Sequence, residues 1–139
     1  MYERLLVAID HSPITERVLA AARELARLSG GEVWVVHTRE RDVISRAGGL
    51  MDIETTDEAQ LAVDAAVATL AEAGVKAHGE VRHAIYGYAA REIIDSAREH
   101  DASVIVMGSK GHGDLAGLLV GSTAHKVIHL SDRAVLVVR

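Results

Sequence analysis

The feature that most limits the fold of this chain is a regular alternation of short apolar runs with longer amphipathic segments. The apolar runs are rich in β-branched residues and almost free of polar alternation, as is typical of strands buried on both faces. They span Leu5 to Ile9, Val33 to Val36, Val104 to Met107 and Ala134 to Val138, and a weaker strand is expected around Lys76 to Arg82. Because such strands need a covering layer on each side, the pattern predicts a parallel sheet between helices.

Three segments between these strands have the periodicity of amphipathic helices, with apolar residues at positions i, i+3, i+4 and i+7. Their apolar stripes are Val18, Ala21, Ala22 and Leu25; Val63, Ala66, Val67 and Leu70; and Ala90, Ile93, Ile94 and Ala97. A fourth helical segment follows Gly121. The order predicts an α/β chain: a single-domain, open, Rossmann-like sheet of five parallel strands, joined by right-handed crossovers with helices on both faces.

Turn-forming residues mark the expected ends of these helices. Gly30 and Gly74 stand where helix C-caps belong. Ser12-Pro13 predicts an N-cap followed by a first-turn proline, and Ser122 is expected to cap the last helix. The only long irregular connection is predicted from Arg39 to Thr56, as a lid or a partner-binding loop.

Length and composition exclude several classes of function. A chain of 139 residues is expected to form one domain over residues 1–139. Its 15 Lys and Arg against 20 Asp and Glu give a net charge of -5, the wrong sign for a protein that coats nucleic acid. The absence of cysteine removes disulfides and thiolate metal sites. Without a signal peptide or an apolar run of membrane-spanning length, we expect a cytoplasmic protein that uses no membrane.

The chemistry is concentrated in a glycine-rich stretch from Gly108 to Thr123, between an expected strand and an expected helix. Glycines let a backbone approach a ligand closely, and a helix start offers unpaired N–H groups and the positive end of its dipole to an anion. In open α/β sheets ligands lie beyond the carboxyl ends of the strands, where Asp10-His11-Ser12 is also expected. The sequence therefore predicts a phosphate-binding site at this edge.

The spacing of these residues resembles the nucleotide-binding members of the universal stress protein family. The matching pattern is Gly108, two residues, Gly111, nine residues, then Gly121 and Ser122, together with Asp10-x-Ser12 after the first strand. The resemblance covers essentially the whole chain. It implies the strand order 3-2-1-4-5, which would place Asp10 beside Gly108.

The same resemblance implies a stress-response regulator that binds an adenine nucleotide, either ATP or AMP and ADP, with Mg²⁺ on the phosphates. Ala8, Asp10 and Thr38 would line the adenine and ribose side. The ribose and phosphates would be held by Gly108, Ser109, Gly111, Gly121, Ser122 and Thr123, and Ser12, Met107 and His112 complete the expected nucleotide-binding set. An acid at Asp114, where relatives often have glycine, makes the phosphate loop less positive and leaves ATP against AMP open.

Other motifs compete with this interpretation. The pattern Gly111-x-Gly113-x-x-Ala116 is similar to a dinucleotide fingerprint, but no following mononucleotide half remains in the chain. His125 and His129 are four residues apart on one helix and could bind a metal with His112. Because no Glu follows His125 as it does in zinc proteases, no metal site is predicted.

No nucleophile–base pair or carboxylate dyad stands out, so no catalytic residue is predicted. The leading hypothesis is a nucleotide-binding regulatory module. One rival is a slow ATPase or phosphotransferase that uses the same pocket, with Ser109, Ser122 or Thr123 as the phosphoacceptor. A second rival is an adaptor that never fills the pocket and acts through its dimer surface.

The last apolar strand is followed only by Arg139, so nothing in the sequence is expected to cover its outer edge. An uncovered strand edge is a template for pairing with another chain. We therefore predict an isologous homodimer through the C-terminal strand, as the resemblance also implies. The pairing residues would be Val135, Leu136, Val137 and Val138.

Overall fold

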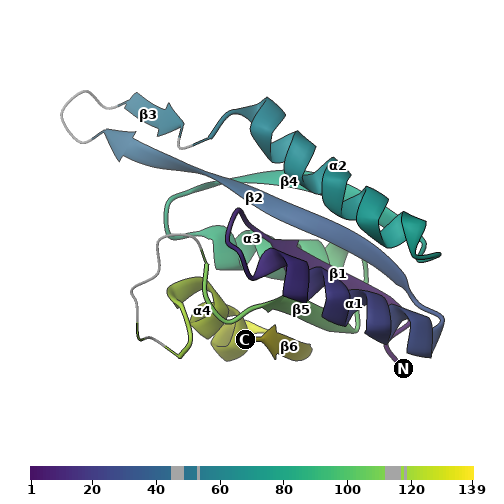
Figure 1. Cartoon of the computed structure of the whole chain (residues 1–139). Coiled ribbons are helices and arrows are strands. Elements are labelled where there is room, and N and C mark those ends of the chain that lie inside the picture. The colour runs from purple at the N-terminus through teal and green to yellow at the C-terminus, as the bar shows by residue number, and fades with distance from the viewer. Residues whose placement is uncertain (45–48, 53, 112–116, 118) are drawn as a thin grey trace.

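In the computed structural model, helices and strands alternate along almost the whole chain (Figure 1). The structure describes residues 1–44, 49–52, 54–111, 117 and 119–139. The elements are β1 (Arg4–Ile9), α1 (Thr15–Ser29), β2 (Glu32–Ile44), β3 (Gly49–Asp52), α2 (Thr56–Glu72), β4 (Ala77–Ile85), α3 (Ala89–Glu99), β5 (Val104–Gly108), α4 (Ser122–Leu130) and β6 (Ala134–Val138).

Five parallel strands form the sheet in the spatial order β4-β2-β1-β5-β6, which is the predicted order 3-2-1-4-5. β1 lies in the centre, paired with β2 on one side and with β5 on the other. The residues Leu5, Leu6 and Val7 of this central strand are completely buried. The predicted α/β class and open parallel sheet are therefore confirmed.

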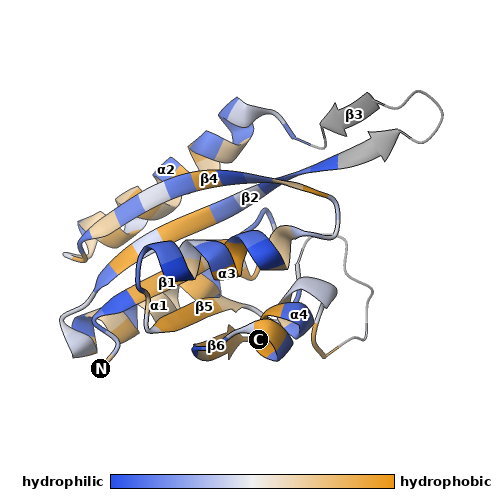
Figure 2. Cartoon of the chain, turned by 180° about the vertical axis from the view of Figure 1, so that it is seen from behind, coloured by the Kyte–Doolittle hydropathy of each residue, from blue (hydrophilic) through white to orange (hydrophobic). Residues whose placement is uncertain are grey.

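Helices cover both faces of this sheet, as the apolar stripes predicted. Leu5 and Val7 belong to a buried cluster with residues of α1 and α2, whereas Leu6 and Ala8 belong to a second cluster with residues of α3 and α4. This division follows from the alternation of side chains along a strand. Figure 2 shows β5 almost entirely in the hydrophobic colour, with hydrophilic stretches on the helices.

The prediction of an irregular connection from Arg39 to Thr56 was wrong. β2 continues to Ile44 and pairs antiparallel with the additional strand β3. Arg41 pairs with Asp52 of β3 and with Ile85 of β4, so β3 and β4 flank this part of β2. Residues 45–48 and 53 of the connection lie outside the described residues. The hairpin extends beyond the rest of the sheet before the chain enters α2 (Figure 1), and Glu54 just before α2 contacts His11, which follows β1.

The predicted glycines stand at the ends of helices, but the predicted serines do not cap the starts of helices. Gly30 and Gly74 take positive φ angles of 67° and 81° at the ends of α1 and α2, as predicted. Ser12 and Ser122 are not N-caps, because α1 is preceded by Ile14 and α4 by Gly121. The hydroxyl of Ser12 instead donates to the Asp10 carboxylate. Among the described residues, no helix combines the length and apolar character needed to span a bilayer.

Candidate functional site

A cavity of about 640 Å³ opens at the carboxyl ends of β1 and β5, beside the middle of β2. Its wall contains eight of the predicted nucleotide-binding residues, namely Ala8, Asp10, Thr38, Met107, Gly108, Gly111, Ser122 and Thr123. Ser12, Ser109 and Gly121 are not part of the wall, and His112 lies outside the described residues. The fold thus brings together residues from both ends of the chain at the edge where ligands bind in open α/β sheets.

The strand register sets the floor of this cavity. Ala8 is paired with Val36 on β2 and with Met107 on β5, so β1 and β5 end at nearly the same level while β2 continues beyond them. The side chain of Ala8 is only a methyl group, which leaves room above the centre of the sheet. The cavity is therefore a direct product of the parallel topology and of a small residue near the end of the central strand.

The two ends of the glycine-rich stretch are joined by main-chain hydrogen bonds. The Gly121 amide donates to the Ser109 carbonyl over 2.5 Å, and the Ser109 amide donates to the Val138 carbonyl over 2.7 Å. Ser109 is 3% exposed, so these two hydrogen bonds fix the glycine-rich stretch from a buried position. Because the Gly121 amide is engaged, the N–H groups available to an anion are those of the first turn of α4.

This first turn of α4 faces the cavity through Ser122, Thr123 and Ala124. Within the described residues no side chain caps the helix. The first N–H groups of a helix have no partner inside it, and the helix dipole adds partial positive charge at the same end. With Lys110 also on the wall, this side of the cavity suits an anion such as a phosphate.

A short polar network holds the Asp10 side chain. The amide and hydroxyl of Ser12 donate to one carboxylate oxygen of Asp10, over 2.9 and 2.5 Å. The Thr15 hydroxyl donates to the Asp10 carbonyl over 2.8 Å. An aspartate bonded to the backbone two residues later forms a tight local turn. Ser12 therefore orients Asp10 at the cavity wall, which explains why its hydroxyl does not cap α1.

Thr38 lines the cavity and carries a buried, unsatisfied hydroxyl. Its Oγ1 atom is buried and has no hydrogen-bond partner among the described residues. Leaving a buried hydroxyl unpaired costs about 1–3 kcal/mol. Because Thr38 itself lines the cavity, a turn of its side chain would bring this hydroxyl to a polar atom of a ligand.

The turn between β4 and α3 forms part of the rim. The Gly87 amide donates to the Glu40 carboxylate, and the Lys126 ammonium donates to the Gly87 carbonyl, both over 3.0 Å. Tyr86 lies beside this turn on the cavity wall and is 66% exposed. Lys126 is thus tied to the rim, whereas Lys110 belongs to the glycine-rich stretch itself.

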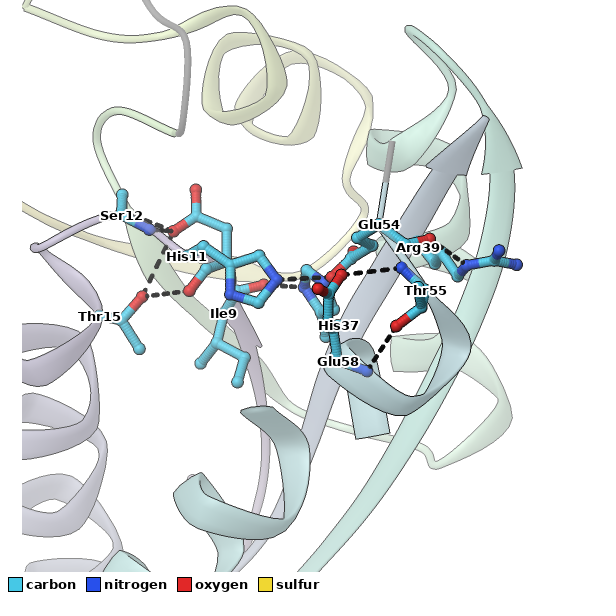
Figure 3. A network of polar contacts seen from close by, with 10 residues as sticks. Ile9, His11, Ser12, Thr15, His37, Arg39, Glu54, Thr55 and Glu58 are labelled. Atoms are coloured by element: carbon cyan, nitrogen blue, oxygen red, sulfur yellow. Dashed lines mark hydrogen bonds and ion pairs between the residues drawn. The ribbon is translucent and has the colours of Figure 1, made fainter. Parts of the chain in front are cut away.

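Sequence reasoning missed a polar cluster of His11, His37 and Glu54 on the same wall (Figure 3). Nε2 of His37 lies 2.5 Å from one Glu54 carboxylate oxygen, and Nε2 of His11 lies 2.5 Å from the other. Burial alone would raise the pKa of the Glu54 carboxyl, but the hydrogen bonds from the two histidines outweigh it and lower this pKa. Each histidine comes just after an apolar run of the sequence, and this position was a signal that could have pointed to the cluster. Glu54 had no such signal, because the hairpin that brings it to the site was not predicted.

The histidines considered at first for a metal site lie elsewhere. The rings of His125 and His129 are stacked with centroids 6.3 Å apart, and His112 lies outside the described residues. Among the described residues, potential ligand atoms converge instead at His11, His37 and Glu54, where they lie within 4.8 Å of one another.

Comparison with known proteins decides the family. The model of the universal stress protein family matches residues 1–139. The chain belongs to the universal stress protein family. Universal stress protein YxiE of Bacillus subtilis is 33% identical, with 100% of both chains covered. Universal stress protein A homolog 1 of Coxiella burnetii is 30% identical, with 99% of this chain and 96% of the relative covered.

Solved structures of universal stress proteins show the same fold. One from Archaeoglobus fulgidus is 30% identical, has a TM-score of 0.75 and matches over 100% of both chains. A second structure, of the universal stress protein from Archaeoglobus fulgidus in complex with dAMP, is 29% identical with a TM-score of 0.76, and covers 99% of this chain and 98% of that one. The resemblance read from the glycine spacing is therefore confirmed.

Proposed function

We propose that this chain is a nucleotide-binding regulatory protein of the stress response, which holds an adenine nucleotide in the cavity at the carboxyl ends of β1 and β5, beside β2. The observation that carries the proposal is a cavity wall that combines Thr38, whose buried hydroxyl has no partner among the described residues, with the uncapped start of α4. The complex of the Archaeoglobus fulgidus relative with dAMP supports an adenine nucleotide as the ligand.

The adenine and ribose would occupy the side formed by β1 and β2. Ala8 and Met107 offer apolar surface for a base, and the Thr38 hydroxyl can donate to or accept from a ring nitrogen or an amino group. The oriented carboxylate of Asp10 is an acceptor suited to ribose hydroxyls. This half of the cavity would therefore select for a nucleoside.

The phosphates would lie against Gly108, Gly111 and the first turn of α4, with Lys110 nearby. The net charge of -5 does not prevent this, because salt screens remote charges over roughly 8 Å. Hydrogen bonds to charged groups contribute about 1.5–3 kcal/mol each, so local geometry outweighs the overall charge. Ser122 and Thr123, which line this side, have hydroxyl oxygens of the kind that Mg²⁺ accepts; they would hold Mg²⁺ bound with ATP, which would offset the phosphate charge.

The protein would act as a homodimer through β6. β6 pairs with β5 on one side, and no described strand pairs with its other side. Because the Val138 carbonyl accepts from Ser109, the alternation of a strand turns the main-chain groups of Val137 toward the open edge. The Ser109 carbonyl also accepts from the Gly121 amide. Ser109 is therefore hydrogen-bonded both to β6, the strand of the proposed dimer, and to the far end of the glycine-rich stretch.

The burial of Ser109 bears on the rival enzymatic hypothesis. A phosphoacceptor must reach the terminal phosphate, and Ser109 is only 3% exposed. Ser122 and Thr123 line the cavity and are the remaining acceptors for an autophosphorylating protein. Mass spectrometry of the intact chain after incubation with ATP and Mg²⁺ tests this rival through the mass of one phosphoryl group.

The proposal is tested by identifying the ligand of freshly purified protein and by titration calorimetry with ATP, ADP and AMP. Recovered ATP supports binding without turnover, whereas recovered ADP or AMP leads to an assay for hydrolysis. In Gly121→Val, a β-branched side chain at the start of α4 blocks close approach of a phosphate, and we expect affinity to fall at least ~10-fold, equal to about 1.4 kcal/mol. Absence of binding to any adenine nucleotide by the folded wild type would refute the proposal and favour the adaptor.

A further inference from the structure

The side chains of His11, His37 and Glu54 come from three separate segments and point at one another (Figure 3). His11 follows β1, His37 is paired with Ile9 in the sheet, and Glu54 stands just before α2. The side chains of His37 and Glu54 are only 5% and 12% exposed, whereas that of His11 is 45% exposed. The cluster is therefore buried on one side and open to solvent and to the cavity on the other.

The hydrogen bonds of His37 leave a place for a cation. Its Nδ1 atom lies 3.0 Å from the Ile9 carbonyl oxygen, which can only accept, so Nδ1 carries a hydrogen. In a neutral ring Nε2 then presents a lone pair, and it faces a carboxylate oxygen of Glu54, which is also an acceptor. Two acceptors at this distance repel each other unless a cation, either a proton or a metal ion, lies between them.

We propose that His11 Nε2, His37 Nε2 and the Glu54 carboxylate form a binding site for a divalent transition-metal ion of the zinc class. Two imidazoles and one carboxylate are a ligand set that zinc accepts with a fourth position left open. Mg²⁺ and Ca²⁺ prefer oxygen ligands throughout and fit this set poorly. All three residues line the cavity, so the open fourth position would be available to water or to a ligand there.

Hydrogen bonds from neighbouring groups already fix the positions of His37 and Glu54, as such bonds fix the ligands of known metal sites. A histidine that binds a metal through one ring nitrogen usually donates its other N–H to a carbonyl or carboxylate, and the Ile9 carbonyl takes this part for His37. The Arg39 guanidinium donates to the main-chain carbonyl of Glu54 over 2.9 Å. Thr55 and Glu58 form a capping box that fixes the start of α2 directly after Glu54.

Metal binding requires only small movements. Zinc bonds of about 2.0–2.1 Å in tetrahedral geometry separate neighbouring ligand atoms by about 3.3 Å. Each Glu54 oxygen lies 2.5 Å from one of the two Nε2 atoms, so each of these pairs must move apart by less than a bond length. All the ligand atoms lie within 4.8 Å of one another, so the approach needed between the others is about 1.5 Å at most. The exposed ring of His11 can turn outward, while His37 stays anchored to Ile9.

The test uses the metal alone, without nucleotide. Protein stripped with a chelator is titrated with zinc chloride by calorimetry and with Co²⁺ by visible absorption, which reports tetrahedral coordination. We expect one ion per chain in the wild type. Glu54→Gln keeps the size of the side chain but weakens the ligand, and His11→Ala changes a half-exposed position. Each is expected to lower zinc affinity at least tenfold and to abolish the tetrahedral cobalt spectrum.

The matched control is His129→Ala, which removes a histidine from α4 outside the cluster. It is expected to bind zinc as the wild type does. Wild-type affinity in a folded Glu54→Gln protein, or loss of binding in His129→Ala instead, would overturn the proposal, as would a wild type that takes up no zinc at micromolar concentration. Because no nucleotide is present, these results are independent of the proposed nucleotide function.

Discussion

Gly108, the last residue of β5, packs so closely against Ile14 that a Cβ atom added to Gly108 would lie 2.7 Å from the Cγ2 atom of Ile14. The same atom would lie 3.3 Å from the main-chain carbonyl oxygen of Lys110. Gly108 and Ile14 both line the cavity. The glycine is therefore required at this position because two wall segments meet over it, and a positive φ angle plays no part.

Gly108→Ala is expected to destabilise the protein by about 1–3 kcal/mol, because an added methyl group in a tightly packed site forces its neighbours to shift. Urea unfolding measures this change. Removing the Cγ2 atom in the double variant Gly108→Ala/Ile14→Ala should recover part of the loss, with a coupling energy of about 0.5–3 kcal/mol. Strictly additive effects of the two substitutions would show that this contact is not the cause.

Thr38→Val should separate binding from stability. The variant keeps the shape of the side chain but removes the hydroxyl that has no partner among the described residues. The unliganded protein should be as stable as the wild type or more so, while nucleotide affinity falls about tenfold, since a net hydrogen bond contributes about 1 kcal/mol. Calorimetry and urea unfolding provide the two readouts.

The control for this substitution is Thr69→Val on the exposed side of α2, where the hydroxyl donates to the Ala65 carbonyl. It should leave nucleotide affinity unchanged. Equal affinity of Thr38→Val and wild type would remove Thr38 from the proposed site.

Val137→Pro tests the proposed dimer. The main-chain N–H of Val137 points to the open edge of β6, so proline there removes no hydrogen bond within the sheet but prevents pairing with a second chain. Sedimentation at micromolar concentration should show a dimer for the wild type and for the control Val137→Thr, and a monomer for Val137→Pro. A wild-type monomer, or a dimeric proline variant, would contradict pairing through this strand.

The ion pairs around Arg82 predict a pH dependence of stability. Arg82 contacts Glu80, Glu92 and Glu99, and its hydrogen bond lowers the pKa of the Glu99 carboxyl below the ordinary value of 4.5. A carboxyl whose pKa is lower in the folded state stabilises the fold at pH above about 4.5, and this contribution is lost as the pH falls through the folded value. The difference in urea midpoint between wild type and Arg82→Met should therefore be largest near neutral pH and shrink in acid.

Arg17→Met on the exposed side of α1 is the matched control, because it removes the same charge from a surface position. Its urea midpoint should follow that of the wild type at every pH. If Arg82→Met behaves in the same way as this control, the ion pairs do not contribute to the pH dependence.

Local sequence patterns were sufficient to predict the elements that have a distinct apolar run or glycine spacing. The apolar runs became β1, β5 and β6, and the glycine spacing correctly indicated the family and the edge of the sheet where a cavity lies. The hairpin of β2 and β3 was missed although its pairing partners are close in the chain, because the charged run from Arg39 to Asp42 carries no apolar strand signal. The prediction of Ser12 as a cap failed because the nearby carboxylate of Asp10 takes the same hydroxyl.

The sequence by itself thus determined the α/β alternation, the helix-ending glycines and the place of the glycine-rich stretch between a strand and a helix, because each depends on neighbouring residues and on elementary backbone preferences. Only the tertiary structure decided that Glu54 meets His11 and His37, and that the Thr38 hydroxyl is left without a partner among the described residues. Both outcomes depend on strand register and on the path of a hairpin, which set distances between residues far apart in the chain.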